Sequence, residues 1–119
     1  MSTKTINQPA VDIVLPANTN IFLTIFIGYA QMGASQVQFA GDPAPIAKGT
    51  ITHLALGNSN SLKGKTLEIL SKVLESNTAT MNYIVTHDFS DGTPAHFTTS
   101  GAFAASGDIL IWNTTYNFK

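Results

Sequence analysis

The sequence predicts an all-β protein, an antiparallel β-sandwich of jelly-roll or immunoglobulin-like type with about eight strands. Short runs rich in Val, Ile, Thr and Phe are separated by turn segments rich in Gly, Pro, Asn and Asp. These turn segments recur at intervals of about 8–12 residues, a spacing typical of sandwiches and barrels. The 119 residues are enough for one domain with its own hydrophobic core.

The composition is apolar and nearly uncharged: 44% of residues are hydrophobic, 11% are charged and the formal net charge is −1. All six basic residues are lysines, and they do not form the concentrated basic footprint of a nucleic-acid-binding protein. We therefore expect no nucleic-acid partner. The absence of Cys excludes disulfides and thiolate metal ligands.

The sequence predicts neither a membrane span nor a secretion signal. Its longest apolar run, Ile21–Ile27, is far shorter than the roughly 20 residues of a membrane helix. The polar residues 1–10 lack the apolar segment of a signal peptide. We therefore expect a soluble protein, and the sequence leaves its compartment unknown.

The first elements follow from local composition. Residues 1–10 show no apolar alternation and are predicted to be a flexible arm, ahead of a single sandwich domain over residues 11–119. Val11–Leu15 is a short strand that ends at Pro16. Ile21–Tyr29 is the most hydrophobic stretch, and its β-branched and aromatic residues predict a central strand buried on both faces.

The middle of the chain holds two alternating strands and one ambiguous stretch. Ser35–Ala40 and Thr50–Leu56 alternate polar and apolar residues, and the second is expected to bury His53. In Leu62–Ser76 the charged residues recur at helical spacing, which would give a short helix near residues 65–75. The apolar residues of the same stretch also fit one face of a strand, and we favour the strand.

The remaining strands are predicted over Met81–Phe89, Ala95–Thr99 and Ile109–Phe118, with an Asp91-Gly92 hairpin turn between the first two. Alternation places one face of each strand in the core. The predicted core residues are Ile13, Leu15, Ile21, Leu23, Ile25, Ile27, Val37, Phe39, Leu54, Leu56, Leu67, Ile69, Tyr83, Val85, Phe97, Ile109 and Ile111.

A metal site is one candidate function, at the hairpin formed by residues 86–96. His87 and His96 lie four residues before and after Asp91-Gly92, so a tight turn would bring them close to opposite one another. Asp88 could then add an oxygen ligand to the two imidazoles. The simpler interpretation is that both histidines are ordinary strand residues beside a turn.

A carbohydrate site is a second candidate, on the last strand. Trp112 and Tyr116, four residues apart, share one face of the strand because side chains alternate with a period of two. If exposed, this face would offer a platform on which sugar rings stack. Asn113 completes this ligand-binding set, because a neutral amide can both donate hydrogen bonds to sugar hydroxyls and accept them. If the aromatic face points inward, it belongs to the core.

No sequence motif indicates catalysis, and the Gly-x-Ser-x-Gly elbow of many hydrolases is missing. We predict that the protein is not an enzyme and uses no cofactor. The high apolar content and near-zero net charge favour a binding or assembly module that self-associates, as a homo-oligomer or with a protein partner. Glycan binding and metal binding are the alternatives.

Overall fold

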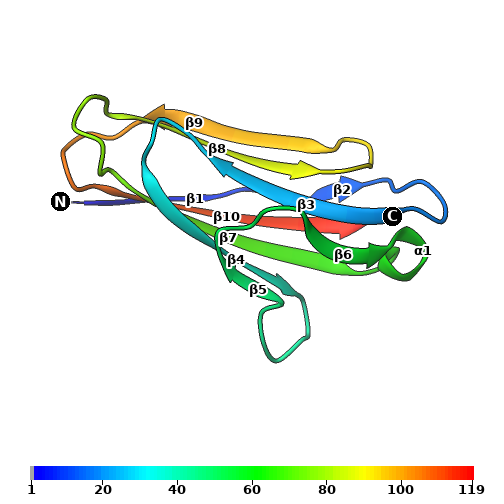
Figure 1. Ribbon diagram of the computed structural model, residues 1–119. Helices are drawn as coiled ribbons and strands as arrows, with labels where there is room; N and C mark the ends of the chain where they lie inside the picture. Colours follow the sequence, from blue (N-terminus) through cyan, green and yellow to red (C-terminus); the bar gives the residue numbers. More distant parts are fainter. Residues whose placement is uncertain (1) are drawn as a thin grey trace.

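The computed structural model describes residues 2–119, which form two β-sheets packed face to face (Figure 1). The predicted all-β sandwich is confirmed, with ten strands and one short helix in this part of the chain. The large sheet has the order β1-β10-β7-β4-β5, with β2 also alongside β10, and the small sheet has the order β6-β3-β8-β9. The elements are β1 (Thr3–Asn7), β2 (Val11–Ile13), β3 (Asn20–Ile27), β4 (Met32–Phe39), β5 (Ala47–Gly49), β6 (Leu54–Asn58), α1 (Ser59–Leu62), β7 (Thr66–Leu74), β8 (Asn82–Phe89), β9 (His96–Ala102) and β10 (Ile109–Phe118).

The beginning of the chain is paired to the large sheet. Residues 3–7, which we assigned to a flexible arm, form β1 and run parallel to β10, as does β2 further along. All other strand pairs are antiparallel, as predicted. The backbone N–H of Ser2 also donates to Asp108 Oδ1 at 2.7 Å. β1 pairs with the edge of β10, which lies over a hundred residues later in the chain. No local sequence pattern therefore predicts β1.

The ambiguous stretch is a strand at the middle of the large sheet. β7 pairs with β10 on one side and with β4 on the other, and it buries Leu67, Ile69 and Val73 on its inner face. The helix near residues 65–75 is therefore absent, and the short helix α1 comes earlier. Asn58 caps that helix by accepting a hydrogen bond from the backbone N–H of Asn60.

Of the segment expected as one strand over Thr50–Leu56, only residues 54–56 are in a strand, at the start of β6, and residues 50–53 connect it to β5. β5 belongs to the large sheet, β6 belongs to the small sheet, and the chain crosses between them. At the crossing His53 has a left-handed backbone (φ 49°) and is exposed, with its ring stacked on Phe22 at 4.1 Å. The prediction of a buried His53 was wrong, because the chain changes sheets there and the alternation ends.

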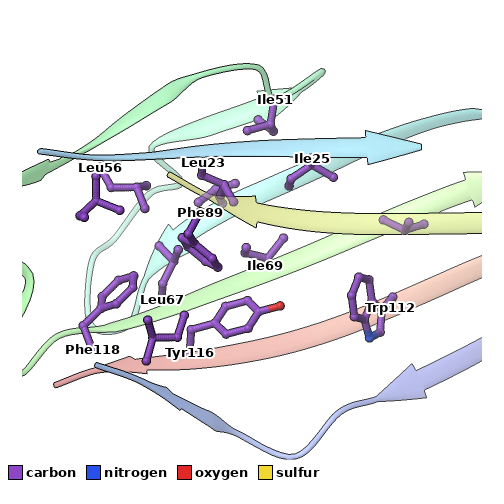
Figure 2. Close-up of a cluster of buried hydrophobic side chains, with 14 of the residues drawn as sticks. Leu23, Ile25, Ile51, Leu56, Leu67, Ile69, Phe89, Trp112, Tyr116 and Phe118 are labelled. Carbon is purple, nitrogen blue, oxygen red and sulfur yellow. The ribbon is translucent and has the colours of Figure 1, made fainter. Parts of the chain in front are cut away.

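The core lies between the two sheets, as Figure 2 shows. β3 is central in the small sheet, as predicted, but only its inner face is covered, and Phe26 on the outer face is 59% exposed. Four predicted core residues are only partly buried and pack against the border of the core: Ile27, Phe39, Leu54 and Phe97. The other predicted positions before β10 are buried, and the core also includes residues that we did not predict: Ile51, Leu62, Val73, Phe89 and Phe103.

β10 faces the opposite way from the prediction. Ile109 and Ile111 point away from the core, and the buried residues are Leu110, Trp112, Thr114, Tyr116 and Phe118. The strand is apolar or aromatic on both faces at its start, so alternation alone did not decide which face is inside. Across residues 2–119, no helix is long and apolar enough to cross a membrane.

Candidate functional site

The interior of the sandwich contains a chain of hydrogen-bonded polar side chains, which we call the His87 network. His87 of β8 places Nδ1 at 2.8 Å from Tyr116 Oη and Nε2 at 3.1 Å from Ser71 Oγ. Ser71 Oγ lies 2.8 Å from Ser35 Oγ. The imidazole ring also stacks on Trp112, with 4.2 Å between ring centroids. The network therefore links β8 of the small sheet to β10, β7 and β4 of the large sheet.

Burial keeps this network neutral. Desolvation lowers the pKa of His87 to about 3, and desolvation also raises the pKa of Tyr116. At neutral pH the imidazole is uncharged, so one ring nitrogen donates a hydrogen bond and the other accepts one. The two hydroxyl partners, Tyr116 and Ser71, can supply both roles.

The Ser71–His87 contact has the geometry of a nucleophile beside its base, with Tyr116 at the ring nitrogen where a triad holds its carboxylate. However, Ser71 and His87 have no exposed surface. The network approaches solvent at Ser35, which is 5% exposed and lines a cleft of about 370 Å³ between β3 and β4. We therefore assign the His87 network a structural role, in which it holds the two sheets in one alignment.

The predicted metal ligands are separated by a one-residue difference in strand register. The expected turn would have placed His87 opposite His96, but Asp88 is opposite His96 and His87 is opposite Phe97. This shift places His87 in the core while Asp88 and His96 form an ion pair on the outer face. The longer connection follows from Thr93, which exchanges two backbone hydrogen bonds with Val14 instead of closing a tight turn.

Because His87 lies in the core, Asp88 and His96 are the two predicted ligands left on the outer face. Within residues 2–119, no group of three or more His, Asp or Glu side chains is placed to hold a metal ion. Two ligands are fewer than a structural or catalytic zinc site uses. The metal site is therefore not assembled by this arrangement of His87, Asp88 and His96.

The predicted carbohydrate residues are also divided between the two faces of β10. Trp112 and Tyr116 are fully buried between the sheets, so they offer no platform to a ligand (Figure 2). Asn113 points to the opposite side, the outer face of the large sheet. Its Nδ2 donates to Asn7 Oδ1 at 2.8 Å.

Asn113 lies in a hollow of about 570 Å³ on the outer face of the large sheet, which we call the polar hollow. Strand register places side chains of β1, β10, β7 and β4 in two rows across the strands. The outward residues of these rows are Asn7, Asn113, Leu70 and Gln36 in one row, and Thr115, Glu68 and Gln38 in the next. Amides and hydroxyls dominate, and within the described part of the chain the only charged group lining the hollow is the carboxylate of Glu68.

The opposite end of the same face is apolar. Met32, Leu74 and Ile109 lie side by side on β4, β7 and β10. Met32 is 65% exposed and Leu74 is 38% exposed. The outer face therefore changes from apolar to polar along the strands, with Lys72 between the two ends.

The edge strands of the two sheets differ in how well they are protected from pairing with a strand of another chain. In the large sheet, β5 is three residues long and contains Lys48, and the other edge contains Lys4 in β1 and Asp12 in β2. In the small sheet, β6 has a bulge against β3. β9, at the other edge, is seven residues long and contains no Lys, Asp, Glu or Pro. Short length, charge and bulges are the devices that prevent edge pairing. β9 is not short and has no bulge against β8, and its one ionisable side chain is His96 at its first residue, paired to Asp88.

Sequence reasoning found Asn113 but missed the residues that surround it. The alternation of Gln36 and Gln38 with apolar neighbours marked them as outward residues of one strand. Their proximity to Asn113 and Glu68 depends on β7 lying between β4 and β10, and that order is not visible in any local pattern. No family model matches this chain, and no curated protein or solved structure matches it.

Proposed function

We propose that this protein is a non-catalytic β-sandwich module that self-associates, with β9 of one copy pairing with β9 of a second copy. The unprotected edge of β9 is the observation that carries this proposal. In Figure 1 this strand lies at the outer border of the upper layer, with no element beyond it.

The hydrogen bonds to β8 determine which backbone groups of β9 remain free. Phe89 N–H donates to the carbonyl of Ala95 at 2.9 Å, and Phe103 N–H donates to the carbonyl of Met81 at 2.7 Å. Alternation then directs the backbone groups of odd-numbered residues toward β8 and those of even-numbered residues outward. The outward set is His96, Thr98, Ser100 and Ala102.

This outward set is complementary to itself. A two-fold axis at Thr99 pairs antiparallel copies of β9 over their whole length, with Thr98 opposite Ser100 and His96 opposite Ala102. In this register every outward residue faces an outward residue, and each such pair can exchange two hydrogen bonds. No pair places like charges opposite each other, and the net charge of −1 adds little repulsion between copies.

The first test is the molar mass in solution by multi-angle light scattering, from micromolar to millimolar protein. We expect a reversible dimer with twice the 12.7 kDa mass of the chain. The Thr98→Lys/Ser100→Lys double variant should be monomeric, because it places lysines opposite each other across the two-fold axis. Both side chains are exposed in the monomer, so the variant should fold normally.

A matched control carries the same added charge in exposed turns, as Ala44→Lys/Ala104→Lys. The control should dimerise like the original protein. A monomer at every concentration contradicts self-association. A dimer that survives the β9 substitutions shows that the copies meet elsewhere, and it would overturn the assignment to β9.

A further inference from the structure

We infer that the polar hollow on the outer face of the large sheet binds a neutral oligosaccharide. This site is independent of the proposed dimer, because β9 belongs to the other sheet. The carbohydrate hypothesis from the sequence relied on Trp112 and Tyr116, which are buried. The inference here relies on Asn113 and on side chains that strand order brings to it.

The footprint of the hollow has the size of a small oligosaccharide. Neighbouring strands are about 4.8 Å apart, so the four strands β1, β10, β7 and β4 span about 14 Å from first to last. The two rows of side chains are two residues apart along each strand, a separation of about 7 Å. The volume of about 570 Å³ is within the common range for small-molecule sites.

Several polar atoms in the hollow have no protein partner within residues 2–119. Asn113 Nδ2 is used by Asn7 Oδ1, and Gln38 Nε2 is used by the carbonyl of Asp42 at 2.8 Å. Gln36 Nε2 is 3.5 Å from Gln38 Oε1. The free groups are the amide nitrogen of Asn7, Oδ1 of Asn113, Oε1 of Gln36, the hydroxyl of Thr115 and the carboxylate of Glu68. They include donors and acceptors close together, and a sugar hydroxyl acts as both.

The charge of the hollow selects against anionic ligands. Among residues 2–119, Glu68 is the only charged side chain that lines it, so an acidic ligand would meet a like charge there. A hydroxyl can instead donate to this carboxylate in a charge-assisted hydrogen bond. Leu70, at the centre of the first row, offers an apolar surface of the kind that sugar C–H groups cover.

An extended peptide fits this surface less well. Peptides that join a sheet take their affinity from free backbone groups at a strand edge. In the hollow, β10 and β7 have neighbours on both sides, so their backbone groups are already paired. Recognition must therefore come from side chains, and these are the neutral amide and hydroxyl groups that suit a polyol.

The test is a titration of ¹⁵N-labelled protein with cellobiose, maltose, lactose and N,N′-diacetylchitobiose, each at millimolar concentration, followed by ¹H–¹⁵N NMR. We expect saturable shifts from at least one disaccharide, centred on the amides of β10, β7 and β4 and on the side chains of Gln36 and Asn113. The Thr98→Lys/Ser100→Lys variant should give the same shifts, because β9 is far from this face. Binding therefore succeeds or fails independently of dimer formation.

Three variants locate the site. Asn113→Ala and Gln36→Ala should each raise the dissociation constant about five- to tenfold, through the loss of one hydrogen bond. Thr86→Ala, on the outer face of the small sheet, should leave it unchanged. If none of the four sugars shifts an amide of the large sheet, or if Asn113→Ala and Gln36→Ala bind as well as Thr86→Ala, the inference is overturned.

Discussion

The inner and outer faces of β7 and β10 both carry polar side chains, but the two faces differ in how fully these side chains are hydrogen-bonded within the protein. On the inner face, the polar groups of Ser71 and Tyr116 bond to His87. On the outer face, Asn113 and Glu68 carry polar atoms that no protein group within residues 2–119 satisfies. The polar groups of the His87 network are therefore bonded to one another and link the two sheets, while those on the outer face stay accessible to a ligand.

The largest expected difference between the faces comes from two neighbours on β10. Trp112→Ala should lower the free energy of unfolding by about 3–5 kcal/mol, because it opens a cavity in the core. Ile111→Ala, one residue away on the outer face, should cost about 1 kcal/mol or less. Urea denaturation of both variants checks this. Equal losses would contradict this assignment of the two faces, and a larger loss for Ile111→Ala would mean that the faces of β10 are exchanged.

A more conservative substitution of Trp112 tests the role of its indole N–H. Trp112 Nε1 is buried and has no partner within the part of the chain that the structure describes. Trp112→Phe keeps an aromatic ring against His87 and removes this N–H, so it should cost much less than Trp112→Ala.

The hydroxyl of Tyr116 provides the next comparison. Tyr116→Phe removes the nearer partner of His87 Nδ1 and should cost about 1–3 kcal/mol, because only the long contact to Thr114 Oγ1 at 3.5 Å remains at this buried nitrogen. Thr115→Ala, on the outer face beside it, should change the free energy of unfolding by about 0.5 kcal/mol or less. An unchanged urea midpoint for Tyr116→Phe would contradict the His87 network.

The buried His87 should make the stability of the protein depend on pH. The pKa of His87 is lowered to about 3 in the folded state, so the unfolded chain binds the proton more readily below pH 6.5. Its contribution to stability is present above pH 6.5 and is lost as the pH falls toward 3. Between pH 7.5 and 5 this loss should reach about 2 kcal/mol, before most carboxylates titrate.

Urea midpoints at several pH values test this contribution. In His87→Gln the slope between pH 7.5 and 5 should become shallow, whatever the stability of the variant at neutral pH. In His96→Gln the slope should persist, because the buried imidazole of His87 is unchanged. A slope that disappears with His96 and persists with His87 would reverse the assignment.

The smallest expected effect concerns the apolar end of the outer face. Met32→Ser removes an exposed side chain and should change the free energy of unfolding by about 0.5 kcal/mol or less. Val37→Ser, on the inner face of the same strand, should be strongly destabilising because Val37 is fully buried. Denaturation curves of the two variants separate surface from core on β4.

Much of the fold could be predicted from the sequence, because alternation and turn residues are local signals. The strands around Leu23, Val37 and Val85, and their buried faces, follow from such signals. The candidate sites could not be predicted, because they depend on register and strand order. One residue of register separated His87 from His96, and the order of β4, β7 and β10 assembled the polar hollow.

The pairing of β1 and β2 with β10 has a consequence for how the protein is made. The contact between Ser2 and Asp108 spans 106 residues, and β10 lies between the first two strands and β7. During synthesis, β1 and β2 leave the ribosome early but have no partner until β10 has emerged. The large sheet must therefore be completed after translation of that strand, and nascent chains that stop before it expose the unpaired edge of β7 to other chains.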